Sequence, residues 1–243
     1  MIDIPFIRDV EFTVVHHAPF SDSTRLHVLS WIMHCDTAHK CCRKTEFLPS
    51  RLLDIRDLDR IELRELADDQ GTGRHHGHKM YAALSHCWGT SPRKFLTTKA
   101  TLSWMKSGFP LSSDVPQTFS DAIIVARSLG IPYLWIDSLC IIQDDVSDWA
   151  VEASRMANVY SNVYLTIAAV DAGDDNDGFL KPRPSLYAKV EITSPIGEVC
   201  PLYLHREHIR NSSLDSPLFR RGWVLQEQFL PRRTVCFSAD KIS

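Results

Sequence analysis

The sequence predicts an α/β fold in three layers, with a parallel sheet covered by helices in a flavodoxin-like layout. Strand-length apolar runs lie at 81–86, 132–137 and 163–170. Helix-like segments separate these runs, and the order strand, helix, strand, helix, strand is typical of parallel strands with crossover helices. Each run is also followed by polar residues, and open α/β sheets bind ligands beyond the carboxyl ends of their strands. We therefore expect the three runs to be parallel neighbours.

The segment before the sheet predicts an amphipathic helix over residues 22–34. It opens with residues that cap helices, and its apolar side chains recur at helical spacing, namely Leu26, Leu29, Ile32 and Met33. We take residues 1–46 as an N-terminal helical extension and 47–243 as the main domain. Two short strands, 51–56 and 60–66, are predicted to form a β-hairpin elaboration ahead of the parallel sheet.

The connections between the strands have clear helix signals. After Thr118, apolar residues keep one helical face until Gly130, and a second helix capped by Ser147 or Asp148 precedes the third strand. Residues 189–193 and 201–205 alternate around Ile196–Gly197, which predicts an inserted β-hairpin. A fourth strand, 233–238, closes the pattern, and we expect the chain to be part of a longer protein.

The bulk composition excludes several classes of protein. The 243 residues are 44% hydrophobic and carry a net charge of −3, which gives no reason to expect nucleic acid as a partner. No apolar run is long enough to span a bilayer, and Asp3 and Pro5 interrupt any signal peptide. Seven cysteines, an odd number, argue against a disulfide framework. We expect a cytoplasmic protein with no membrane span.

The polar residues at the strand ends are the candidate site. The first run delivers Ser85, His86 and Trp88, and the second delivers Asp137 and Ser138. Since the carboxyl ends of parallel strands share one edge, these side chains are predicted to line a common cleft.

Other chemistries are alternatives. Cys35, His39 and Cys42 share one helical face and could start a zinc site. The fourth ligand would come from His34, Cys41 or the histidines of loop 67–79, although the spacing matches no common zinc signature. A Cys–His nucleophile pair would use Cys87 or Cys140 with His86, but adjacent strand residues 86 and 87 point to opposite faces. The acidic stretch 171–178 fails the calcium-loop pattern and is predicted to be a solvated loop.

Four motifs resemble the fungal heterokaryon-incompatibility (HET) domain. They are Tyr81-Ala-Ala-Leu-Ser-His-Cys-Trp-Gly89, Leu134-Trp-Ile-Asp-Ser-Leu-Cys-Ile-Ile-Gln-Asp144, Met156-Ala-Asn-Val-Tyr160 and Arg221-Gly-Trp-Val-Leu-Gln-Glu227. The resemblance runs from about residue 47 to the end. It implies a cell-death module of fungal nonself recognition that acts with an upstream recognition protein or domain.

HET domains in turn look related to Toll/interleukin-1 receptor (TIR) domains, some of which hydrolyse NAD. In those enzymes a glutamate in a late Trp-x-x-x-Glu helix is essential, and Glu227, four residues after Trp223, matches it. Glu152, four residues after Trp149, is a lower-ranked match because its helix comes one crossover too early. The resemblance implies NAD as substrate, no resident cofactor, and self-association on activation.

A carboxylate suits this chemistry for a physical reason. Cleavage of the nicotinamide–ribose bond passes through an oxocarbenium-like state, which a buried carboxylate stabilises. The leaving group is already a cationic pyridinium and needs no general acid, so one glutamate can suffice. Trp88 or Trp223 could stack on a ring, and Arg220 or Arg221 could meet the diphosphate. The rival prediction is a non-catalytic signalling module that acts by self-assembly.

Overall fold

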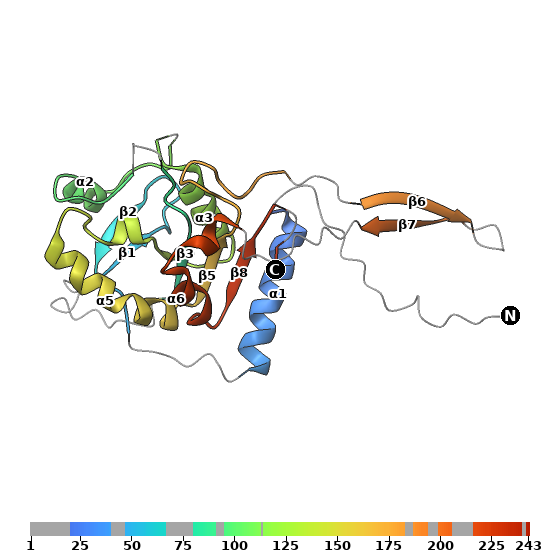
Figure 1. The fold of residues 1–243 in the computed structure, drawn as a ribbon, viewed down its shortest axis with the longest axis horizontal. Coiled ribbons are helices and arrows are strands. Elements are labelled where there is room, and N and C mark those ends of the chain that lie inside the picture. The colour runs from blue at the N-terminus through green and yellow to red at the C-terminus, as the bar shows by residue number, and fades with distance from the viewer. Residues whose placement is uncertain are drawn as a thin grey trace.

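A six-stranded mixed sheet forms the centre of the protein (Figure 1). The computed structural model describes residues 20–39, 47–66, 80–90, 95–112, 114–182, 187–193, 199–205, 216–239 and 242–243. The strand order is β2-β1-β4-β3-β5-β8. The sheet strands are β1 (Arg51–Asp54), β2 (Glu62–Glu65), β3 (Tyr81–Ser85), β4 (Tyr133–Trp135), β5 (Leu165–Ala169) and β8 (Thr234–Phe237).

The parallel part of the sheet confirms the prediction. β3 pairs in parallel with β4 on one side and with β5 on the other, and β8 pairs in parallel with β5. The chain therefore leaves β3 for β4 and then crosses back to β5, so the strand order reverses beside β3. In open α/β sheets such a reversal is where ligands bind.

The predicted N-terminal hairpin is formed, but it is not a separate elaboration. β1 pairs antiparallel with β2 and also antiparallel with β4, so the hairpin extends the central sheet and makes it mixed instead of purely parallel. β1 is buried along its whole length, with Leu52 and Leu53 in the core between the buried charged residues Arg51 and Asp54.

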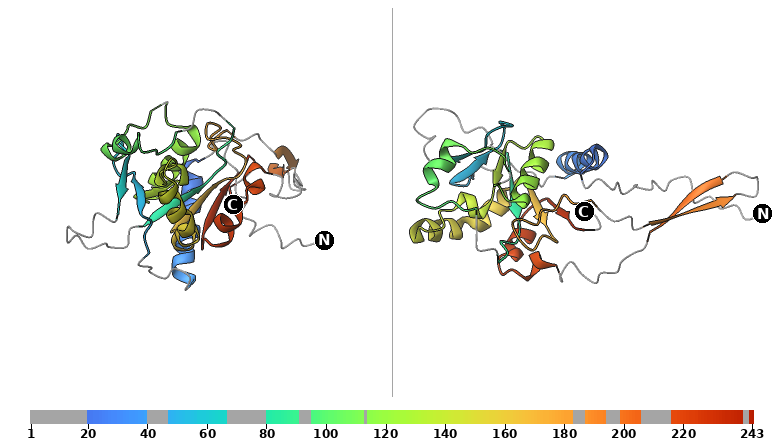
Figure 2. Two further views of the ribbon diagram at one scale, coloured as in Figure 1. Left: turned by 60° about the vertical axis from the view of Figure 1, so that its left-hand side comes forward. Right: turned by 90° about the horizontal axis from the view of Figure 1, so that it is seen from above.

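Helices cover both faces of the sheet, as alternation along β3 shows. Tyr81 donates to the peptide oxygen of Val159 in α5 (Val146–Asn162), whereas the ring of His86, just past the strand, packs edge-on against Phe119 in α3 (Gln117–Ser128). Residues 81 and 86 point to opposite faces, so α3 and α5 lie in different layers. Figure 2 agrees, with α1 and α3 on one side of the sheet and α5 and α6 (Val224–Phe229) on the other.

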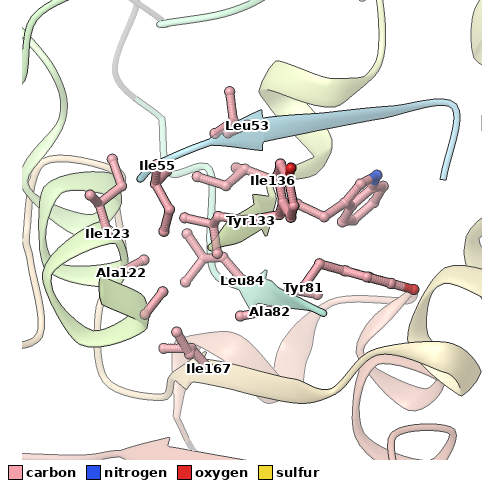
Figure 3. Close-up of a cluster of buried hydrophobic side chains, with 14 of the residues drawn as sticks. Leu53, Ile55, Tyr81, Ala82, Leu84, Ala122, Ile123, Tyr133, Ile136 and Ile167 are labelled. Atoms are coloured by element: carbon pink, nitrogen blue, oxygen red, sulfur yellow. The ribbon is translucent and has the colours of Figure 1, made fainter. Parts of the chain in front are cut away.

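The core lies mainly between the sheet and these helices. Figure 3 shows Ala122 and Ile123 of α3 facing Ala82 and Leu84 of β3, with Ile167 of β5 below them. A smaller apolar cluster lies under α6 and the 3-10 helix η3 (Pro217–Arg220), and it consists of Cys87, Ala168, Val170, Leu218 and Val224. This second cluster seats α6 on β5.

The N-terminal helix forms, and its predicted apolar face is confirmed in part, since Ile32 is buried and Leu29 packs against the core. α1 (Asp22–Ala38) buries Val28 and Ile32 in the main core, whereas Leu26 and Met33 are exposed. Asp36 of α1 also accepts from Arg233 and from Tyr164, which ties the helix to the edge of the sheet. Residues 1–19 and 40–46 lie outside the described part, so the predicted boundary at residue 46 stays a prediction.

Two short helices and a two-stranded hairpin are the remaining elements of the described residues. α2 (Leu102–Ser107) lies beside β2, and the four-residue α4 (Asp137–Cys140) follows β4 directly. β6 (Tyr187–Thr193) and β7 (Val199–His205) form the predicted antiparallel hairpin as a separate sheet, apart from the rest in Figure 1. The predicted turn at 196–197 falls outside the described residues. Within the described ranges no helix is long and apolar enough to cross a membrane.

Candidate functional site

Glu227 is a buried glutamate on the inner face of α6. Its exposure is 1%, and Val224, one turn earlier, is buried beside it against β5. Ser85 at the end of β3 donates its hydroxyl to Glu227 Oε2 at 2.5 Å. This hydrogen bond joins residues 142 positions apart and places the carboxylate at the carboxyl end of the central strand.

Arg221 links Glu227 to the end of the next strand. Its Nη1 lies 3.5 Å from Glu227 Oε2, and its Nη2 lies 3.7 Å from Asp137 Oδ2. The same guanidinium donates to the peptide oxygen of His86. A single cation therefore lies between two carboxylates that come from different crossovers of the sheet.

Asp137 is held in a fixed orientation at the start of α4. Trp88 Nε1 lies 3.1 and 3.0 Å from its two carboxylate oxygens, and the peptide nitrogen of Ser138 donates to Oδ1 at 2.7 Å. Asp137 is the first residue of this short helix, where a carboxylate is electrostatically favoured, and it also faces Arg221. The hydroxyl of Ser138 is fully buried and has no hydrogen-bond partner in the described part of the chain.

His86 forms the inner wall of the cluster. The side chain is buried, with Nδ1 4.0 Å from Asp137 Oδ1 and Nε2 3.1 Å from Asp175 Oδ1. The Nε2 contact is an electrostatic one, because no aligned hydrogen bond forms at this nitrogen within the described residues. The imidazole therefore stands between two carboxylates.

Burial and the neighbouring charges act in opposite directions on this cluster. Burial raises the pKa of Glu227, and Arg221 and the hydrogen bond from Ser85 reduce that rise without cancelling it. Burial would lower the pKa of Arg221, but the carboxylates of Glu227 and Asp137 outweigh it and raise that pKa. Glu227 and Arg221 therefore each favour the charged form of the other, with Glu227 buried and Arg221 partly exposed to water.

The sequence from β3 to Glu227 matches one protein family. The family model described as heterokaryon incompatibility protein (HET) matches residues 81–227, which is more than half of the chain. The chain belongs to the HET family. No curated protein matches it, and no solved structure does. The HET match begins at the first residue of β3 and ends at Glu227, so it contains every residue of the cluster described above.

Six of the eight predicted site residues are linked in this HET cluster by direct contacts, namely Ser85, His86, Trp88, Asp137, Arg221 and Glu227. Ser138 is a neighbour through its peptide nitrogen. Trp223 differs, because it stands at the N-terminus of α6 with 44% of its surface exposed. The ring of Trp223 is thus open to contact from outside.

Asp175 is the residue of the cluster that sequence reasoning missed. The stretch 171–178 was predicted to be a solvated loop, but Asp175 is buried against His86 and Gly178 is buried near α3. Gly89, at φ +66°, lets the loop approach, because a Cβ there would lie 1.9 Å from Asp174 Oδ2. The glycine that ends the first motif was a signal for close backbone approach.

The lower-ranked glutamate lies in a different network. Glu152 of α5 accepts a hydrogen bond from Ser50 at 2.5 Å and lies 3.6 Å from Arg155. None of the contacts of Glu152 in the described residues reaches Glu227. This glutamate holds the segment before β1 against α5.

The thiol and zinc alternatives gain no support from the described residues. Burial raises the pKa of Cys140 to about 12 and also raises the pKa of Cys87, so neither thiol is activated as a nucleophile. Cys35 and His39 lie at the end of α1, but Cys42 and the histidines of loop 67–79 fall outside the described residues. No group of three metal-ligating side chains occurs among the residues that are described.

Proposed function

We propose that this HET chain is a cell-death effector domain of heterokaryon incompatibility and that it hydrolyses NAD at the nicotinamide–ribose bond. The observation that carries the proposal is the Glu227 carboxylate, buried and held by Ser85 and Arg221 at the carboxyl end of β3. Taken in chain order, the four parallel strands have the spatial order 2-1-3-4, the start of a flavodoxin-like sheet. This order supports the distant similarity to TIR domains.

In this mechanism Glu227 stabilises the positive charge that develops on the ribose. The bond between ribose C1′ and the pyridinium nitrogen breaks, and its electron pair neutralises the leaving nicotinamide. Positive charge develops on the ribose, and the ionised carboxylate stabilises it in a site of low dielectric constant. Water then adds to C1′ and loses a proton, which gives ADP-ribose. No cofactor is required.

In the structure Arg221 occupies the position between Glu227 and Asp137. A cationic pyridinium ribose would take the place of this guanidinium, which could then meet the diphosphate. We assign Asp137 and Ser138 to the sugar hydroxyls, Ser85 and His86 to the inner wall, and Trp88 and Trp223 to ring stacking. Trp223 is the better stacking candidate, since the indole of Trp88 is already bound to Asp137.

The test compares two matched glutamates. Glu227 and Glu152 are both buried, and each accepts a hydrogen bond from a serine hydroxyl at 2.5 Å. An arginine nitrogen lies 3.5 Å from the carboxylate of Glu227 and 3.6 Å from that of Glu152. Each Glu→Gln change should therefore cost similar stability. We expect Glu227→Gln to reduce NAD cleavage by on the order of 10²-fold, whereas Glu152→Gln changes it little.

The assay uses the full chain fused to a chemically inducible dimeriser, with nicotinamide measured by chromatography before and after dimerisation. If the assembled wild type releases no nicotinamide, or if Glu227→Gln keeps wild-type turnover, the enzymatic proposal is wrong. Thermal unfolding of both variants serves as the control for folding.

The second candidate is a non-catalytic module that signals by self-assembly. The observation that favours it is the outer face of α6, where Leu225 and Phe229 are 65% and 77% exposed, opposite the buried Glu227. Cell killing without nicotinamide release, lost on Phe229→Ser, would establish this candidate instead.

A further inference from the structure

The segment after β5 brings a buried carboxylate to the back of the site. Asp175 is 3% exposed, and its Oδ1 lies 3.1 Å from His86 Nε2. This contact is electrostatic, so the negative charge of Asp175 acts on the Nε2 edge of the imidazole. Asp175 therefore biases which edge of the imidazole faces inward.

The loop does not need this carboxylate as an anchor. Backbone contacts already fix it to α3, because Thr118 donates its peptide nitrogen to the oxygen of Asp175, and Gly178 donates to the Thr118 hydroxyl. Asp177 closes the turn by accepting from Gly173 and Asp174. Burial of a further carboxylate is costly unless it interacts with a polar group. The contact with His86 is an interaction of this kind.

The orientation of His86 affects two other residues of the site, Asp137 and Arg221. Its other ring nitrogen lies 4.0 Å from Asp137 Oδ1, and its peptide oxygen accepts from Arg221. Phe119 packs edge-on against the His86 ring, with the two ring centroids 5.1 Å apart, and limits the movement of the imidazole on the α3 side. A rotation of the imidazole would therefore alter the surroundings of Asp137, the carboxylate that faces Arg221.

We propose that Asp175 is a positioning residue that orients the His86 ring behind Asp137. The role in turnover rests on the proposed function, but the Asp175–His86 coupling itself does not. In catalysis Asp175 touches no substrate and acts only through His86. A displacement of about 1 Å at a site can cost on the order of 10²-fold in rate, so the effect of losing this constraint is measurable.

The experiment compares Asp175→Asn with Asp177→Asn, the same change two residues away on an exposed side chain of the same loop. The full chain is labelled with ¹⁵N-histidine, and His86→Gln identifies the His86 ring signals among the eleven histidines. We expect Asp175→Asn to shift the ring-nitrogen signals of His86 and to lower kcat by roughly 10- to 100-fold, with KM nearly unchanged. Asp177→Asn should do neither.

A merely structural role would leave the His86 ring signals where they are. Unchanged ring signals in folded Asp175→Asn would overturn the proposal, even if activity fell. If that variant does not fold, Asp175→Glu keeps the charge but shifts it by one methylene, and the same criterion applies. If the assembled wild type cleaves no NAD while the ring signals still shift, the proposed function fails and the coupling between Asp175 and His86 stands.

Discussion

Replacement of Arg221 by glutamine tests whether Glu227 is held as a buried ion. The change removes the guanidinium 3.5 Å from a carboxylate that is 1% exposed, and it leaves Ser85 as the hydrogen-bond donor. Breaking a buried ion pair from one side costs about 3–5 kcal/mol. Since 23% of the Arg221 side chain remains exposed to water, we expect the low end, about 3 kcal/mol at pH 7.

The cost should depend on pH with a definite sign. The pKa of Glu227 is raised by folding, so its ionised form opposes folding at pH values above that pKa. Arg221 lowers this pKa, and its removal raises the pKa further. The stability deficit of Arg221→Gln should therefore shrink as the pH falls through the raised pKa of Glu227 toward its unfolded value of 4.5.

Urea unfolding at pH 7 and pH 5 measures both effects. Arg220→Gln is the control, since it removes the same charge from the exposed neighbouring residue. The double change Arg221→Gln with Glu227→Gln should recover most of the lost stability, because the buried charge of Glu227 is gone and Asp137 keeps Trp88 and the Ser138 peptide nitrogen as donors. The reasoning is refuted if Arg221→Gln is no less stable than the control, or if its deficit grows as the pH falls.

Two other changes test the walls of the site by chemical unfolding. Gly89→Ala should cost about 2 kcal/mol or more, since alanine at φ +66° is strained and its Cβ would meet Asp174, whereas Gly130→Ala at φ +73° in open space should show the backbone cost alone, about 1–2 kcal/mol. Equal losses for the two glycines would contradict the close approach of the loop. Trp88→Phe should cost about 1.5 kcal/mol through its lost contact with Asp137, and an unchanged unfolding midpoint would count against that contact.

The parallel part of the fold was predictable because each element has its own local signal. β3 and β5 are continuous apolar runs, and Gly130 ends α3 with a positive φ as expected. The mixed sheet was not predictable, since nothing in the sequence of residues 51–54 indicates that the second edge of this strand pairs with β4. For α5, Asp145 proved to be the cap instead of the two predicted residues, which is the usual error at a helix boundary.

The candidate site was also predictable only in part. Strand polarity alone places Ser85 and Asp137 at one edge of the sheet, and the helical spacing from Trp223 points to Glu227. The partner of Glu227 was not evident from the sequence, because several arginines lie near it in the chain. Arg221 is the partner, whereas Arg233 binds Asp36 of α1. Asp175 was hidden among several acidic residues, because burial of one of them depends on how the loop folds back onto α3.

The burial of Glu227 in an ion pair does not by itself argue against catalysis. The ionised carboxylate needs a positive partner, and a pyridinium ribose supplies one of the same charge as the guanidinium of Arg221. An exchange of these two cations keeps Glu227 paired, so the large cost of an isolated buried carboxylate is avoided. A neutral ligand at the same place would leave the carboxylate unpaired. On the proposed function, we therefore expect a cationic group of the substrate to replace Arg221 between Glu227 and Asp137.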